Sequence, residues 1–294
     1  MYQNNPPLLV ILGETATGKT RLGLELAKLL DGEIISADSW TVRKELNIGT
    51  DKPSKKDRRE VKHHLIDIVA PNEHFSAVAF KELANKAIEE INSRGKLPII
   101  VGGTGLYIDS VIYDYGFLDD SEPDRRDYLN SLSIEELLEV IYEEGLEISE
   151  RIDQRNKRRL IRLIESSGRE PKKSELRANT LLIGLQMDAV TQAHYIEARV
   201  DRMLREGLEE EVRQLSLKYG CDCEALKGVG YKQWQRYIDG TQCLEETRLQ
   251  IISATNNLAK KQRTWFKRNK SIHWMIQPVD IDKVVELVTT YLSI

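Results

Sequence analysis

The segment GETATGKT at residues 13–20 constrains the fold of this chain more than any other feature. It fits the pattern G-x-x-x-x-G-K-[ST], whose backbone N–H groups surround phosphate oxygens. An apolar run at 8–12 predicts a buried strand before it, and leucines at helical spacing follow it as far as Asp31-Gly32. A strand, a glycine loop and a helix N-terminus in this order direct N–H groups and a helix dipole at an anion. We therefore predict a di- or triphosphate site, with Lys19 on terminal phosphate oxygens and the Thr20 hydroxyl on Mg²⁺.

Strands and helices alternate along residues 8–115. Apolar runs of strand length are separated by segments with apolar residues at helical spacing. We expect strands at 8–12, 33–37, 65–69 and 97–101, and helices at 20–30 and 75–93. This alternation is typical of a parallel sheet with helices on both faces, as in P-loop NTPases. Ligands of such sheets bind at the carboxyl ends of the strands, where the phosphate loop, Asp38 and Thr104 all lie.

The alternation stops after residue 115 and returns near residue 180. Between these points, Glu-rich and Arg-rich amphipathic segments predict an all-helical insertion at 116–179. We therefore expect an α/β core made of residues 1–115 and 180–294. The second part of this core is expected to contain a strand at 181–187, a long helix at 191–219, a helix at 245–268 and a last strand at 272–275.

Composition excludes several classes of protein. Of the 294 residues, 40% are hydrophobic and 31% are charged, which is ordinary for a globular chain. The sequence has no run of 18 apolar residues, and its first residues lack the basic and apolar regions of a signal peptide. We therefore expect a cytoplasmic protein with no membrane segment. Three cysteines without further ligands at zinc-site spacing predict free thiols.

Two segments are strongly basic although the net charge is −4. Residues 151–162 contain six basic residues and one acid, and residues 260–270 contain six basic residues and no acid. Either segment alone is most simply the solvated face of a helix. Two such segments on one chain could together form a groove that follows the phosphates of a nucleic acid.

Three further residues are candidates for chemistry beside the phosphate loop. Asp38 ends a predicted strand, where its carboxylate could act as a general base, bind Mg²⁺ or cap a helix. Thr104 lies among three glycines, which form either a plain turn or a segment that approaches a ligand closely. Arg199 lies near Asp201 on the long predicted helix, and it either pairs with that acid or clamps a diphosphate.

These segments resemble, in their order, those of the tRNA dimethylallyltransferases, which prenylate the exocyclic amine of the adenosine just 3′ of the anticodon. The resemblance covers most of the chain. Besides the phosphate loop, it is carried by SADS at 36–39, NIGTDKP at 47–53, HHLID at 63–67, VGGTGLY at 101–107, residues 156–165, RVDRML at 199–204, GVGYK at 228–232 and AKKQRTW at 259–265. A phosphate loop alone occurs in many families, whereas this ordered series is specific.

The resemblance implies that the loop holds the diphosphate of dimethylallyl diphosphate as a leaving group, together with Mg²⁺. The implied diphosphate site consists of Gly13, Glu14, Thr15, Ala16, Thr17, Gly18, Lys19, Thr20 and Arg199. Lys19, Thr20 and Arg199 would neutralise the charge that develops on the departing diphosphate. Asp38 would accept a proton from the adenine amine, and Thr104 would form a hydrogen bond near the same base.

The resemblance also implies a surface for the anticodon stem-loop of tRNA, from which the target adenosine must flip out of its stack. Both basic segments would then contact RNA phosphates. The implied tRNA-contacting residues are Asp38, Ser39, Trp40, Thr41, Thr104, Arg126, Arg158, Arg159, Leu160, Ile161, Arg162, Lys227, Gly228, Val229, Gly230, Tyr231, Lys232, Lys260, Lys261, Gln262, Arg263, Thr264, Trp265, Phe266 and Lys267. We expect the protein to act as a monomer.

Four positions depart from the family pattern. Thr41 and Arg43 stand where the family usually has Gln and Tyr, Glu14 replaces a usual Pro, and Asn256 replaces a common Arg. Position 41 helps to hold the target adenine in the family. Three alternatives therefore stay open: a P-loop small-molecule kinase, an adenylate isopentenyltransferase that acts on free nucleotides, and a tRNA-binding homologue without catalysis.

Overall fold

The computed structural model describes residues 5–117, 123–150, 152–169 and 172–294. The chain forms two compact units. The larger unit consists of Met1–Ile112 and Leu176–Ile294, and the smaller unit is Tyr113–Glu175. The borders of the smaller unit lie three and four residues before the expected borders of the insertion, 116 and 179.

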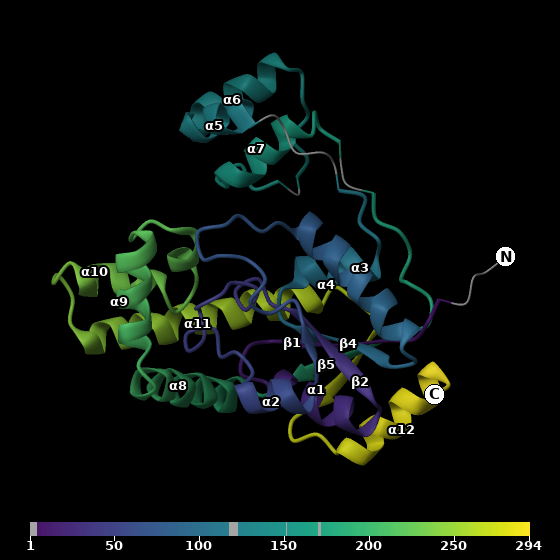
Figure 1. The fold of residues 1–294 in the computed structure, drawn as a ribbon. Helices are drawn as coiled ribbons and strands as arrows, with labels where there is room; N and C mark the ends of the chain where they lie inside the picture. Colours follow the sequence, from purple (N-terminus) through teal and green to yellow (C-terminus); the bar gives the residue numbers. More distant parts are fainter. Residues whose placement is uncertain (1–4, 118–122, 151, 170–171) are drawn as a thin grey trace. The chain divides into compact units, whose positions relative to one another are not determined.

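The larger unit is built on a six-stranded, all-parallel sheet (Figure 1). Its strands are β1 (Leu8–Gly13), β2 (Gly32–Ala37), β3 (His63–His64), β4 (Leu97–Gly102), β5 (Thr180–Gln186) and β6 (Ile272–Ile276). They lie in the order β3-β2-β4-β1-β5-β6, and each neighbouring pair is parallel. The predicted α/β class is therefore confirmed. Because the strands are parallel, β1, β2 and β4 all end at the same edge of the sheet.

Helices cover both faces of the sheet. The helices of this unit are α1 (Lys19–Leu29), α2 (Lys55–Glu60), α3 (Ala77–Ser93), α4 (Gly105–Ile112), α8 (Ala189–Arg205), α9 (Leu208–Tyr219), α10 (Gln235–Ile238), α11 (Leu244–Phe266) and α12 (Ile281–Leu292), with short 3₁₀ helices at Glu224–Lys227 and Lys232–Trp234. Figure 1 shows α1 and α12 on one side of the strands and α3 and α4 on the other.

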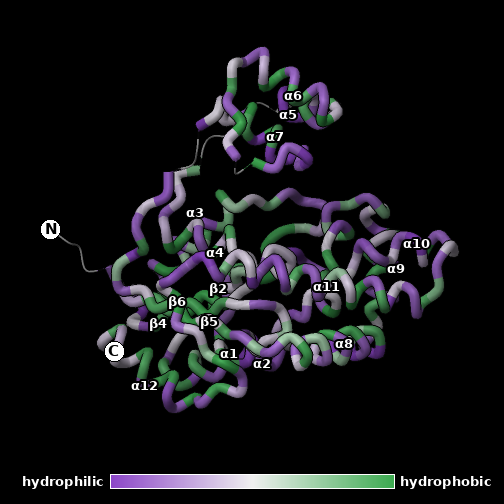
Figure 2. Tube along the Cα trace, turned by 180° about the vertical axis from the view of Figure 1, so that it is seen from behind, coloured by the Kyte–Doolittle hydropathy of each residue, from purple (hydrophilic) through white to green (hydrophobic). Residues whose placement is uncertain are grey.

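The core of the sheet explains this two-sided cover. Leu9 and Ile11 pack in one cluster with Leu26 of α1 and Val288 of α12. Val10, between them in β1, points to the opposite face of the sheet and is equally buried. Figure 2 shows the same central strands as predominantly hydrophobic. The continuous apolar runs in the sequence are therefore strands that bury both of their faces.

Two predicted elements differ from the structure. The single helix expected at 191–219 is wrong, because Gly207 adopts φ 99° and separates α8 from α9. Glycine reaches this left-handed conformation without the steric cost that other residues incur. The strand expected at 65–69 is also wrong, because pairing with β2 uses His63–His64 instead. Leu65 and Asp67 both have φ 59°, which is incompatible with an extended strand.

The described residues of the smaller unit form three helices: α5 (Pro123–Ser131), α6 (Ile134–Glu143) and α7 (Lys157–Glu165). They bury a core of their own, which includes Leu129, Leu137 and Ile161. One antiparallel bridge between Gly116 and Lys172 joins the two chain segments that lead into and out of these helices. Throughout the described ranges of both units, no helix is long and apolar enough to cross a membrane.

Candidate active site

A cavity of about 350 Å³ opens at the carboxyl ends of β1, β2 and β4 in the larger unit. Its walls include Lys19 and Thr20 of the phosphate loop, Asp38 after β2, Gly103 after β4, and Arg199 of α8. Four sequence segments far apart in the chain therefore meet here. The structure places the predicted phosphate loop, the predicted base and the predicted arginine in one cavity.

The phosphate loop is fixed by its backbone. Gly13 has φ 141°, and a Cβ atom there would lie 2.4 Å from the carbonyl oxygen of Leu185, so only glycine fits. Gly18 is left-handed, with φ 85°, and immediately precedes α1. The Thr17 hydroxyl donates to the carbonyl oxygen of Glu14 (2.8 Å) across the loop. These contacts hold the loop in a compact turn at the positive end of the α1 dipole.

Lys19 lies in a cationic environment within this loop. Its ammonium group donates to the carbonyl oxygen of Glu14. Burial, followed by the nearby Arg199 guanidinium, lowers the pKa of Lys19 to about 8. Two cations gathered around a loop of N–H groups make an anion site, and a bound diphosphate would favour the charged form of Lys19.

Arg199 faces the phosphate loop and does not pair with Asp201. Its NH1 group donates to the Thr15 hydroxyl (2.9 Å), and its Nε lies 3.5 Å from a carboxylate oxygen of Asp51. Asp201 instead accepts from Arg248 of α11 (2.5 Å). The alternative of intrahelical pairing for Arg199 is therefore wrong. The arrangement leaves Arg199 directed at the diphosphate end of the cavity.

Asp38 keeps one carboxylate oxygen for local structure. Oδ1 accepts from the backbone N–H groups of Trp40 (2.8 Å) and Thr41 (3.3 Å) and so fixes the bend after β2. Among the described residues, nothing donates a hydrogen bond to Oδ2. The alternative that Asp38 caps a helix is wrong, because a turn and not a helix follows β2. One oxygen fixes this bend, and the other is available to accept a proton or to bind Mg²⁺.

Thr104 contacts the Asp38 segment rather than the cavity itself. Its hydroxyl oxygen accepts from the N–H of Ser39 (3.1 Å), and its own N–H donates to the carbonyl oxygen of Ala37 (3.2 Å). The neighbouring Gly103 lines the cavity. In this structure Thr104 thus joins the end of β4 to the end of β2, and its predicted contact with the base stays a prediction.

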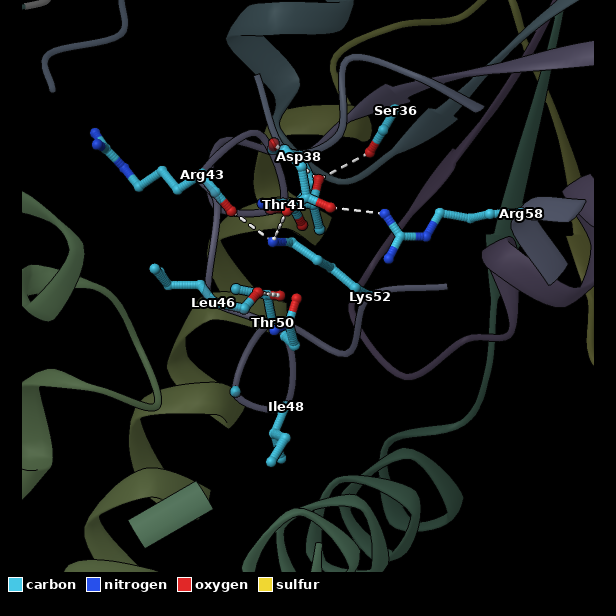
Figure 3. Close-up of polar contacts among 12 residues, drawn as sticks. Ser36, Asp38, Thr41, Arg43, Leu46, Ile48, Thr50, Lys52 and Arg58 are labelled. Atoms are coloured by element: carbon cyan, nitrogen blue, oxygen red, sulfur yellow. Dashed lines mark hydrogen bonds and ion pairs between the residues drawn. The ribbon is translucent and has the colours of Figure 1, made fainter. Parts of the chain in front are cut away.

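The two unusual residues at 41 and 43 are buried and bonded within the protein. The Thr41 hydroxyl lies 2.9 Å from the Ser36 hydroxyl, as Figure 3 shows. The Arg43 guanidinium points away from Asp38 and donates to the carbonyl oxygen of Pro71 (3.1 Å). Burial lowers the pKa of Arg43. Thr41 still lines the cavity, whereas Arg43 serves the packing of the loop.

A buried ion-pair network supports the segment that carries Asp38. Lys52 donates to the backbone carbonyl of Arg43 and to Asp67 (2.6 Å), and Arg58 pairs with the other oxygen of Asp67 (2.6 Å). Figure 3 shows Lys52 reaching this carbonyl. The side chain of Lys52 is only 2% exposed, and burial lowers its pKa. Loss of Asp67 would leave the buried Lys52 charge without its counter-ion, which is costly, whereas without Lys52 the half-buried Asp67 would keep its pair with Arg58.

The loop that carries Asp51 is held by a single carboxylate. Glu211 of α9 accepts from three successive backbone N–H groups, those of Asn47 (2.8 Å), Ile48 (2.8 Å) and Gly49 (3.0 Å). The hydroxyl of the buried Tyr231 donates to the same carboxylate (2.7 Å). Glu211 therefore fixes the loop whose end places Asp51 against α8.

Helix α11 closes the cavity over the phosphate loop. Gln262 accepts from the N–H of Thr15 (2.8 Å) and donates to the carbonyl oxygen of Gly103 (3.0 Å). Arg263 pairs with Glu14 through both oxygens of its carboxylate, each at 2.7 Å. The guanidinium of Arg263 is thus bound to the phosphate loop, and its predicted tRNA contact stays a prediction.

Comparison with known proteins decides the family. The sequence model of the family described as IPP transferase matches residues 41–269. This chain belongs to the IPP transferase family. It is 40% identical to the tRNA dimethylallyltransferase of Bacillus cytotoxicus, over 95% of this chain and 93% of that protein. It is 37% identical to the tRNA dimethylallyltransferase of Bacillus subtilis, over 100% of this chain and 98% of that protein.

Solved structures agree with this assignment. The full-length tRNA isopentenylpyrophosphate transferase of Bacillus halodurans matches with a TM-score of 0.77 and 35% identity, over 98% of this chain and 97% of that chain. The corresponding transferase of Staphylococcus epidermidis matches with a TM-score of 0.74 and 32% identity, over 98% and 99%. A eukaryotic dimethylallyltransferase solved with tRNA shares the fold, with a TM-score of 0.85 at 24% identity, over 98% and 80%.

The predicted tRNA contacts of this IPP transferase divide by burial. The exposed members are Arg158, Arg159, Lys227, Lys232, Lys260, Lys261, Thr264 and Lys267. Four apolar or aromatic members are almost fully buried, namely Leu160, Ile161, Tyr231 and Phe266. The prediction is wrong for the side chains of these four, because they form protein cores. Helical periodicity gives the physical reason for two of them, since Leu160 and Ile161 lie on the inner face of α7.

Two predicted arginines of the smaller unit share a buried acid. Arg126 of α5 and Arg162 of α7 both pair with Glu165, whose side chain is fully buried. These pairs tie α5 to α7. Both arginine side chains remain partly exposed, so they can support the unit and face solvent at the same time.

The IPP transferase site contains residues that sequence reasoning missed. Asp51 and Glu211 had been given no role, although Asp51 lies inside a recognised segment. Asp51 pairs with Arg202, 151 residues later in the chain, at 2.7 Å. The sequence did contain a signal. An acid next to a glycine turn, Asp51, can pair with arginines that lie one helical turn apart, as Arg199 and Arg202 do. The partner could only be identified in three dimensions.

Proposed function

We propose that this IPP transferase moves the dimethylallyl group of dimethylallyl diphosphate to the N6 amine of the adenosine 3′ to the anticodon, position 37, of tRNA. The observation that carries the proposal is the mixed lining of one cavity. The phosphate loop, Lys19, Arg199 and Asp38 all line it. Its lining also contains apolar side chains, namely those of Val101, Val200, Met203, Val229, Ile251 and Leu258, among further polar ones. A cavity that offers both cations and apolar side chains suits a short branched hydrocarbon esterified to diphosphate.

The reaction requires one bond to form and one to break. The N6 nitrogen attacks C1 of the dimethylallyl group, and the bond between C1 and the diphosphate oxygen breaks. The electron pair of that bond leaves with the diphosphate. The proton lost from N6 passes to Oδ2 of Asp38, which faces no competing donor among the described residues. General-base help of this kind typically contributes about 10²- to 10⁴-fold to a rate.

Charge on the leaving diphosphate is met by groups already in place. The loop N–H groups and the α1 dipole supply fixed partial positive charge. Lys19 and Arg199 add two cations in the same cavity. Because these groups are held by contacts with Glu14, Thr15 and Asp51, little reorganisation is needed as negative charge develops.

The residues present fit Mg²⁺. Thr20 offers a hydroxyl oxygen at the cavity wall, and no cluster of three or more His, Cys, Asp or Glu that could hold a metal occurs in the described part of the chain. Mg²⁺ suits such a sparse site because it keeps several waters and takes its other ligands from substrate phosphates. When bound, Mg²⁺ would neutralise diphosphate charge as a Lewis acid. Thr20 would hold it there.

Recognition of tRNA falls to exposed cations in both units. Arg158 and Arg159 lie on α7 of the smaller unit, and Lys260, Lys261 and Lys267 lie on or directly after α11 of the larger unit. Contacts to phosphates position an RNA without reading its bases. The target adenosine must leave its stack to enter the cavity. We expect the enzyme to act as a monomer.

The test is a product analysis with two possible acceptors and a control without acceptor. Purified protein, Mg²⁺ and dimethylallyl diphosphate are incubated with unmodified tRNA, with AMP or with no acceptor, and nucleosides are identified by mass spectrometry. We expect N6-dimethylallyladenosine in the tRNA that carries adenosine at position 37. Greater product from AMP would indicate a free-nucleotide transferase instead. tRNA binding in a separate titration, without product, would indicate a non-catalytic homologue. ATP turnover in a parallel reaction supplied with ATP, without product, would indicate a kinase.

A further inference from the structure

The phosphate loop contains an acid where an anion is expected to bind. Glu14 is the second residue of the loop, and it is only 3% exposed. A buried carboxylate beside a diphosphate would repel it and would itself be unstable without a counter-ion. Its presence therefore needs a structural explanation.

Arg263 supplies the counter-ion in a bidentate geometry. Its Nε and NH2 groups donate to the two carboxylate oxygens of Glu14, each at 2.7 Å. The same NH2 group donates to the side-chain oxygen of Gln192 (2.8 Å). Paired hydrogen bonds of this kind fix orientation as well as charge. The Arg263 side chain remains 30% exposed, so the pair lies at the edge of the core and is not completely dry.

The neighbours of this pair hold the next loop residue from both sides. Gln192 of α8 donates to the carbonyl oxygen of Thr15 (3.0 Å). Gln262 of α11 accepts from the N–H of Thr15 (2.8 Å). Both backbone groups of Thr15 and the side chain of Glu14 are thus fixed by two helices. Adjacent residues of α11, Gln262 and Arg263, contribute two of the three side chains in this frame.

We infer that Glu14 and Arg263 are a positioning pair that anchors the phosphate loop to α11 and keeps it in its diphosphate-binding shape. The inference rests on the proposed function in taking diphosphate as the ligand of the loop. Arg263 then acts on diphosphate through Glu14, although its segment is otherwise a predicted tRNA contact. The exposed Lys260 and Lys261 of the same helix keep their predicted role as contacts to RNA phosphates.

Two single variants distinguish a positioning role of the Glu14–Arg263 pair from a role in charge balance alone. If the pair only balanced charge, Glu14→Ala would remove a negative charge beside the site and strengthen diphosphate binding, while Arg263→Ala would weaken it. If the pair positions the loop, both variants weaken binding. The double variant then loses no more affinity for diphosphate than the weaker-binding single variant, because both substitutions break the same contact.

The experiment is calorimetric titration of the full-length protein with inorganic diphosphate in the presence of Mg²⁺, together with tRNA binding at several salt concentrations. We expect Glu14→Ala and Arg263→Ala each to weaken diphosphate binding about tenfold, equivalent to ~1.4 kcal/mol. Their tRNA affinity should stay within about twofold of wild type. Lys260→Ala, the matched control on α11, should weaken tRNA binding and leave diphosphate binding unchanged. Should Arg263→Ala fail to fold, Arg263→Lys keeps the charge, loses the bidentate geometry and should also weaken diphosphate binding.

Four results would overturn the inference. Tighter diphosphate binding by Glu14→Ala would show that the pair only balances charge. A loss of tRNA affinity in Arg263→Ala, with diphosphate binding unchanged, would return Arg263 to the RNA surface. Wild-type protein that binds no diphosphate would overturn the proposed function, and the inference with it, whereas equal binding by wild type and both variants would overturn the positioning role alone.

Discussion

At the scale of single residues, Asp38 has the most specific assignment. Asp38→Asn keeps an oxygen that can accept from the N–H of Trp40, so the bend after β2 should persist. The amide cannot take the proton from N6. We therefore expect kcat to fall by about 10²- to 10⁴-fold. Affinity for tRNA should change little. A large loss of tRNA affinity with unchanged kcat would contradict the role of general base.

Lys19 gives the site a pH dependence. With its pKa lowered to about 8, it is charged in the free protein below that pH and neutral above it. Bound diphosphate favours the charged form, so binding takes up a proton when Lys19 starts neutral. The dissociation constant of dimethylallyl diphosphate should be flat below pH 8 and rise above it by up to about tenfold per pH unit. Lys19→Arg, which stays charged, should remove this rise. If the dissociation constant rose equally with pH for wild type and Lys19→Arg, Lys19 would be excluded as the source of the pH dependence.

The sequence identifies the residues that carry chemistry better than their partners. Lys19, Asp38 and Arg199 follow from the phosphate-loop pattern, a strand end and the family resemblance, and the structure brings all three to one cavity. Glu14 and Arg263 could not be paired from sequence, because contacts across 249 residues leave no local pattern. The family resemblance likewise implied an RNA contact for Arg263 and gave no sign of its ion pair with Glu14.

At the scale of elements, the loop at 47–51 depends on α9. Glu211→Ala would leave three backbone N–H groups without their acceptor. We expect a loss of about 1–3 kcal/mol in the free energy of unfolding and weaker diphosphate binding, since Asp51 would no longer hold Arg199. Glu210→Ala is the matched control, an exposed acid on the same helix, and should stay within ~0.5 kcal/mol. Chemical denaturation measures the free energy of unfolding of both variants. Equal losses in Glu211→Ala and Glu210→Ala would contradict the role of Glu211.

Local patterns predicted most elements but not their interruptions. The strand before the phosphate loop, the helix after it and helix α11 follow from hydrophobic periodicity. The break at Gly207 was missed, because apolar residues continue at helical spacing on both sides of it. The strand at 63–64 was missed for a different reason. Its two histidines are not apolar, so hydrophobic periodicity does not predict a strand here. They form a strand because their backbone pairs with β2 at the edge of the sheet.

At the scale of the whole molecule, tRNA binding should depend on exposed cations in the smaller unit. Arg158 is exposed on α7. Arg158→Glu should weaken tRNA binding and reduce the slope of log affinity against log salt by about one, because a phosphate contact is lost. Lys283→Glu is the control, an exposed charge reversal on α12, outside every predicted contact. Equal slopes for wild type and Arg158→Glu would remove Arg158 from the interface.

The division into two units was visible in the sequence, because strand patterns disappear between residues 115 and 180. What the pattern could not give was the inner and outer face of each helix in the insertion. Leu160 and Ile161 fill its core, while Arg158 and Arg159 face solvent two residues away. A basic segment of the sequence thus forms a basic surface only on the side of its helix that faces solvent.

The central claim is that the phosphate loop holds a leaving group for carbon–nitrogen bond formation. The most direct test is the stoichiometry of a reaction with labelled dimethylallyl diphosphate, tRNA and Mg²⁺, with and without ATP. The account predicts one diphosphate released for each N6-dimethylallyladenosine formed, no requirement for ATP, and no product with Asp38→Asn on the same timescale. Inorganic phosphate released from ATP, with no modified adenosine in any tRNA, would contradict it.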